Sequence, residues 1–62
     1  MRFLLFGTGE YYNRYKIWFD KKDVVALIDN SKEKQGYYID DILVIAPENV
    51  LQYEFDAIII LS

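Results

Sequence analysis

Three uninterrupted apolar runs dominate the pattern of hydrophobic and polar positions along the chain. They span residues 3–6, 24–28 and 57–61. None of them alternates apolar with polar residues, and this pattern is typical of strands covered on both faces, as in a parallel sheet between helices. The second and third runs are rich in β-branched residues, which favours strand over buried helix. We therefore expect three buried strands.

Residues 10–19 show the spacing of an amphipathic helix. Aromatic side chains recur there at intervals that share one helical face. A helix over this range would turn most of them toward the sheet, so we interpret them as core packing rather than as a base-stacking platform. The aromatic residues are Tyr11, Tyr12, Tyr15, Trp18 and Phe19.

The second half of the chain contains shorter elements. By composition, residues 30–36 form a loop. The acidic pair 40–41 lies between two apolar triplets, and we interpret 37–45 as an extended arm with a solvated turn at the pair, or as a single edge strand. Pro47 fits the first position of a short helix over 47–52.

The order of these elements predicts a topology. Short, right-handed connections place the first strand centrally, the second on one side of it and the last on the other. The 37–45 arm then extends the sheet beyond the second strand. A ligand would lie at the carboxyl ends of the strands, near Gly7, Gly9 and Asp29.

Composition excludes several function classes. The 62 residues make a single domain and contain no cysteine and no histidine. Disulfides, thiolate or imidazole catalysis and zinc sites of Cys or His are therefore excluded, and we expect no metal site. A hydrophobic share of 53% indicates a packed domain rather than disorder.

Charge and hydropathy bear on whether the chain binds nucleic acid or spans a membrane. The net charge is −3 and no basic stripe is present, which argues against nucleic-acid binding. The apolar runs stop after about six residues, too short for a membrane span. The absence of cysteine fits a reducing compartment, and we expect a cytoplasmic protein.

The turn Gly7-Thr8-Gly9 is the leading candidate for a binding site. Glycines after a strand let the backbone approach a phosphate, and free amides at a helix start point toward the anion. Asp29 ends the second strand about 20 residues further on, where a carboxylate can accept hydrogen bonds from ribose hydroxyls. The alternatives are a glycine needed only for a sharp turn and an aspartate that caps the following loop.

Two residues depart from the dinucleotide-binding fingerprint. Tyr12 occupies the position of the third glycine, and Glu10 adds a negative charge beside the turn. Both favour a domain without a bound dinucleotide.

The chain carries four blocks in order, FGTGEY at 6–11, VALIDN at 25–30, ILVIAPE at 42–48 and FDAIII at 55–60. Together they resemble the Rossmann-like N-terminal domain of bacterial polysaccharide-biosynthesis proteins. That group includes sugar-nucleotide dehydratases and epimerases, nucleotide-sugar acyltransferases and glycosyltransferase-associated domains. The resemblance covers nearly the whole chain.

This resemblance implies an α/β fold, a small Rossmann-like three-layer sandwich with a mostly parallel sheet of about four strands over residues 1–62. It implies a phosphate-side turn at Gly7, Thr8 and Gly9, a hydroxyl acceptor at Asp29, and Asn30 at the pocket mouth. The ligand would be NAD(P) or a nucleotide sugar, bound by a capsule or lipopolysaccharide biosynthesis protein. No catalytic residue of the family can be placed in the chain.

The alternative is a non-catalytic structural or interaction domain that kept the fold and lost the ligand. A parallel sheet needs cover on both faces, and the chain offers only one and a half helices for it. We therefore expect the domain to be a fragment of a longer protein, or to associate with itself or with another partner.

Overall fold

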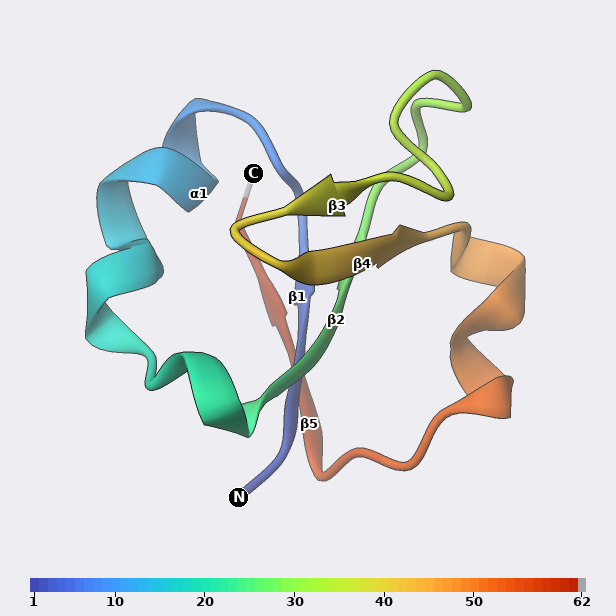
Figure 1. The fold of residues 1–62 in the computed structure, drawn as a ribbon. Helices are drawn as coiled ribbons and strands as arrows, with labels where there is room; N and C mark the ends of the chain where they lie inside the picture. The colour runs from blue at the N-terminus through green and yellow to red at the C-terminus, as the bar shows by residue number, and fades with distance from the viewer. Residues whose placement is uncertain (62) are drawn as a thin grey trace.

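The structure, a computed structural model, describes residues 1–61 and contains five strands, one α-helix and three 3-10 helices (Figure 1). In chain order the elements are β1 (Phe3–Phe6), α1 (Glu10–Tyr15), the 3-10 helices η1 (Lys16–Trp18) and η2 (Lys21–Asp23), β2 (Val24–Ile28), β3 (Tyr38–Ile39), β4 (Ile42–Ile45), the 3-10 helix η3 (Pro47–Gln52), and β5 (Ala57–Ile60). No helix in this part of the chain has the length and apolar character needed to cross a bilayer.

The strands form one sheet in the order β3-β4-β2-β1-β5. The predicted placement of the first strand between the second and the last is confirmed, as is the extension of the sheet beyond β2 by residues 38–45. β1 pairs parallel with β2 and with β5, and β4 pairs parallel with β2, whereas β3 pairs antiparallel with β4.

The predicted fold class is wrong. The chain is not a small Rossmann-like three-layer sandwich with a mostly parallel sheet of about four strands; it is a small five-stranded mixed sheet with few helices. Asp40 and Asp41 have φ values of 52° and 65°, which is the backbone of a tight hairpin turn, and this turn makes β3 antiparallel to β4.

Helical layers are absent from residues 1–61 because the connecting segments are short. The predicted helix over 10–19 ends as an α-helix at Tyr15, after six residues, and continues only as the turn of η1. The segment 47–52 is a 3-10 helix with Pro47 in its first turn, as its sequence predicted for a short helix.

Both faces of the sheet are apolar, which explains why the runs do not alternate. Because successive side chains of a strand point to opposite faces, Leu5 and Leu27 pack with Tyr12 on one face, whereas Leu4 and Ile28 lie on the other. The α1 and η1 segments lie on one side of the sheet and η3 on the other (Figure 1). Val50, Tyr53 and Phe55 pack against the second face.

The aromatic residues of 10–19 divide between the core and the surface. Tyr12 is buried and Phe19 packs against the same cluster, so the interpretation as core is confirmed for these two. Tyr11 and Trp18 are exposed, so for them it is wrong. Both pack against Tyr15 outside the core, with ring centroids 6.4 Å apart for Tyr11 and 5.8 Å apart for Trp18.

Gly7 is held in a tight backbone contact. Its φ is +113°, a conformation that side chains with a Cβ rarely adopt, and a Cβ added there would lie 2.6 Å from the carbonyl oxygen of Leu61. The Gly7 amide donates to the carbonyl of Ile28 at 2.7 Å, and the Leu61 amide donates to the carbonyl of Phe6 at 2.7 Å. Glycine is therefore required here by the packing of three chain segments.

We expect Gly7→Ala to lower the free energy of unfolding by about 2–4 kcal/mol, because the new methyl group meets a backbone carbonyl and the backbone is strained. Gly9→Ala is the matched control, since a Cβ at Gly9 has no neighbour within 4 Å. Urea unfolding followed by circular dichroism measures both variants. Equal destabilisation by the two substitutions would contradict the role of Gly7.

Candidate functional site

Thr8 and Asp29 join the turn after β1 to the end of β2. Because β1 and β2 are parallel neighbours, the segments that follow them lie side by side at one edge of the sheet. The Thr8 amide donates to Asp29 Oδ2 at 3.1 Å, and the Thr8 hydroxyl donates to the same oxygen. Thr8 is the buried polar residue of this region, at 6% exposure.

The other oxygen of the Asp29 carboxylate organises the loop that follows. Asp29 Oδ1 accepts a hydrogen bond from the Ser31 amide at 2.8 Å, which is the local geometry of an aspartate that caps a turn. The Asp29 carbonyl accepts from the Gln35 side chain at 2.9 Å, and the Lys34 ammonium donates to the Thr8 hydroxyl at 3.2 Å. The loop is thereby fastened to the glycine turn.

These contacts set the acidity of Asp29. Partial burial acts to raise the pKa of its carboxyl, but the hydrogen bonds from the Thr8 hydroxyl and from the Ser31 and Thr8 amides, together with the charge of Lys34, outweigh burial. The pKa of Asp29 therefore lies below its ordinary value, and the carboxylate is ionised at neutral pH.

A cleft of about 390 Å³ lies beside this cluster. It is lined by Phe6, Gly7, Asp29, Asn30 and Ile60, so the structure brings three of the predicted site residues to one cavity. The other two take different positions. Thr8 is buried and hydrogen-bonded to Asp29, and Gly9 is exposed at the start of α1, where no side chain caps the helix.

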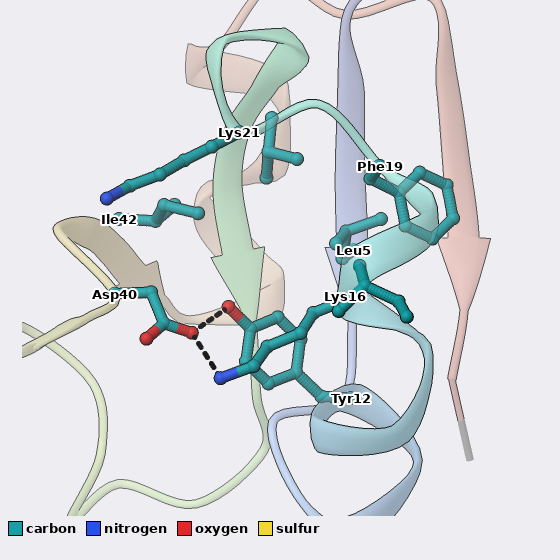
Figure 2. A pocket seen from close by; sticks show the side chains of 9 residues that line it. Leu5, Tyr12, Lys16, Phe19, Lys21, Asp40 and Ile42 are labelled. Carbon is teal, nitrogen blue, oxygen red and sulfur yellow. Dashed lines mark hydrogen bonds and ion pairs between the residues drawn. The ribbon is translucent and has the colours of Figure 1, made fainter.

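A second pocket, of about 270 Å³, lies between α1, η1 and the β3–β4 hairpin (Figure 2). The Tyr12 hydroxyl donates to Asp40 Oδ2 at 2.7 Å, and the Lys16 ammonium donates to the same oxygen at 3.0 Å. Leu5, Phe19 and Ile42 form apolar walls around this group, as Figure 2 shows. These hydrogen bonds connect the β3–β4 hairpin to α1 and η1.

Sequence reasoning missed the cluster. Tyr12 was noted as standing where the fingerprint has its third glycine, and the acidic pair was interpreted as a solvated turn. Tyr12 and the acidic pair are far apart in the chain. Their meeting depends on the hairpin reversal at Asp40, and residue spacing gives no signal for that contact. Lys21 pairs with Asp41 at 3.1 Å, so both acids of the turn have a lysine partner. Among residues 1–61 no group of side chains has the makeup of a metal site.

The Tyr12–Asp40 bond shifts both pKa values. Burial raises the pKa of the Tyr12 phenol well above its usual range, and the neighbouring Asp40 carboxylate raises it further. For the exposed Asp40 carboxyl, the hydrogen bonds from Tyr12 and Lys16 lower the pKa.

Asp29 should contribute to stability only while it is ionised. Because its pKa is lower in the folded chain than in the unfolded one, this stabilisation is present above about pH 4 and is lost as the pH falls through the folded-state pKa. We expect Asp29→Asn to be less stable than the wild type at pH 7, with the two stability curves converging as the pH falls below about 4. Urea unfolding of both proteins over this pH range measures the difference in stability.

Glu33→Gln provides the control for Asp29→Asn, since Glu33 is an exposed carboxylate of the same loop. It removes the same charge without a hydrogen bond to the turn. A pH dependence of Asp29→Asn that matches Glu33→Gln would contradict the assigned role of Asp29.

Ionisation of Tyr12 should be missing from an alkaline absorbance titration of the folded protein. We expect Tyr12→Phe to leave the amplitude of that titration unchanged up to the pH at which the chain unfolds. A loss of amplitude in Tyr12→Phe below the pH of unfolding would show that Tyr12 is not protected.

Comparison with known proteins places the chain by family rather than by an individual relative. No curated protein and no solved structure matches the chain. The family model that matches is described as C2185-like, N-terminal, and it covers residues 1–62. We predicted that the chain is a Rossmann-like domain of a bacterial polysaccharide-biosynthesis protein, and this prediction is wrong. The predicted link to capsule or glycosyltransferase pathways is wrong for the same reason. The protein belongs to the C2185-like N-terminal domain family.

Proposed function

We propose that this domain binds a nucleotide or a nucleotide sugar in the cleft beside the glycine turn. The observation that carries the proposal is the position of the cleft. Its lining residues come from the carboxyl ends of β1, β2 and β5, three neighbouring parallel strands. In sheets of parallel strands, ligands bind outside the carboxyl ends, where the connections diverge to opposite faces. Here β1 connects through α1 on one face and β4 through η3 on the other.

The lining offers both apolar and polar contacts. Phe6 and the exposed Ile60 present apolar surface suited to a base or a sugar ring. Asn30 is exposed at the mouth and its side-chain amide can both donate and accept hydrogen bonds. The Asp29 carboxylate retains lone pairs for a ribose hydroxyl beyond those used by Thr8 and Ser31.

A cation lies close to the turn. The Lys34 ammonium is within hydrogen-bond distance of the Thr8 hydroxyl, and its side chain is otherwise exposed. An ammonium at this position can attract a phosphate group that approaches the turn. Gly9 does not line the cleft, but without a side chain it leaves the surface beside the turn open.

A second candidate function is a non-catalytic interaction domain. Two observations favour it. The Asp29 carboxylate accepts three hydrogen bonds from its own chain, which leaves fewer lone pairs for a ligand. Ile17 and Trp18 are 81% and 76% exposed on η1. Large apolar side chains next to one another on a surface are typical of protein contacts.

Amide NMR titration with UDP, NAD and uridine tests the proposal. We expect saturable shifts centred on Gly7, Asp29 and Asn30 with UDP or NAD, and weaker binding of uridine because it lacks phosphate. Lys34→Gln should weaken UDP binding by roughly fivefold, about 1 kcal/mol for one charge-assisted contact. Lys32→Gln is the matched control, an exposed lysine of the same loop.

A dispersed spectrum without saturable shifts at millimolar UDP and NAD would overturn the nucleotide proposal and leave the interaction domain as the better function. An equal effect of the two lysine substitutions would remove Lys34 from the site.

A further inference from the structure

The outer edge of β5 is open within residues 1–61. β5 is the last strand of the sheet and pairs with β1 on one side. Charged residues and proline usually prevent an edge strand from pairing with another chain. Residues 57–61 contain neither. Ile58 and Ile60 are 39% and 69% exposed and point to the same face of the sheet.

The backbone groups on this edge follow from the pairing with β1. The amides of Ala57 and Leu61 donate to the carbonyls of Arg2 and Phe6, so alternate residues of β5 face β1. Between them, Ile58 and Ile60 direct their N–H and C=O groups outward. Two residues thus present a complete set of strand donors and acceptors to an incoming strand.

We propose that two copies of this domain associate through β5, which pairs antiparallel with β5 of the second copy and forms one continuous sheet. The register places Ile59 opposite Ile59 of the second copy. Ile58 then faces Ile60 of the second copy in a hydrogen-bonded pair, and the twofold relation repeats this contact. All outward backbone groups of Ile58 and Ile60 are paired, and four isoleucine side chains meet on one face.

Charge favours the antiparallel over the parallel direction for the second copy. Glu54 and Asp56 precede β5, and both contact Arg2 of their own chain, at 3.3 Å and 2.7 Å. An antiparallel pair places the acidic residues before β5 of the two copies at opposite ends of the joined strands. A parallel pair would bring the acids of the two copies together, which costs energy by like-charge repulsion.

The same arrangement completes the apolar wall of the cleft. Ile60 lines the cleft from β5, and Ile58 of the second copy lies next to it on the same face. Association therefore extends the cleft wall with a residue from the second copy, although the dimer itself does not depend on a ligand.

Sedimentation equilibrium over a range from micromolar to millimolar protein tests the association. We expect the apparent mass to rise with concentration from that of the 7.4 kDa monomer toward twice that value. Ile58→Lys should shift this transition at least tenfold to higher concentration, because it places a charge in the apolar contact. Leu51→Lys is the matched control, since Leu51 is 93% exposed on η3, outside β5, and should leave the transition unchanged.

Single cysteines test the register, because the chain has none of its own. Under oxidation, Ile59→Cys should give a disulfide-linked dimer, since the two copies of residue 59 face each other across a non-hydrogen-bonded pair. Ile58→Cys should cross-link far less, because the two copies of residue 58 are offset along the strands. Amide NMR spectra under reducing conditions check that both variants remain folded.

A wild type that stays monomeric at millimolar concentration would overturn the proposal. A dimer that Ile58→Lys does not weaken, or one that cross-links through Ile58→Cys rather than Ile59→Cys, would overturn the β5 pairing in this register. The NMR titration measures ligand binding and sedimentation measures mass, so failure of the dimer and failure of the nucleotide proposal are distinguishable.

Discussion

The hydrogen bonds between Thr8 and the Asp29 carboxylate are the contacts on which the carboxyl end of this sheet depends. They hold the turn after β1 against the end of β2, and the remaining Asp29 oxygen shapes the loop that carries Lys34. The cleft exists because these segments are fixed next to one another. A charged group with several backbone and hydroxyl donors is among the stronger polar contacts available to a small domain.

The shortness of the chain explains much of the remaining structure. A domain of this size cannot supply full helical layers, and small domains bury a smaller share of their surface than large ones. Aromatic side chains compensate in part, with Tyr12 and Phe19 covering one face and Tyr53 and Phe55 the other. Cover ends near β5, where Ile58 and Ile60 remain exposed.

The sequence predicted β1, β2 and β5 and their order, because each is a continuous apolar run and the connections are short. The turn at Asp40 and Asp41 was one of the two interpretations of residues 37–45 and is confirmed, but the antiparallel pairing across it was not predicted, since the left-handed backbone there is one of several conformations open to aspartate. The candidate site was predicted in part. Gly7, Asp29 and Asn30 line one cleft, as neighbouring strand ends require, and Asp29 caps the following loop, which was the alternative given for this residue. Tyr12 marked a missing glycine in the sequence, whereas its burial and its bond to Asp40 depend on tertiary packing.

The hairpin turn restricts how this family member can vary. Asp40 meets two demands, a backbone with positive φ and a carboxylate that reaches Tyr12 and Lys16. Glycine satisfies the first demand and loses the second, whereas glutamate retains the charge but is strained in that backbone conformation. Asparagine keeps the turn and an oxygen acceptor but gives up the ion pair. Few amino acids remain acceptable at this position, so drift here should be slower than at the exposed positions around it.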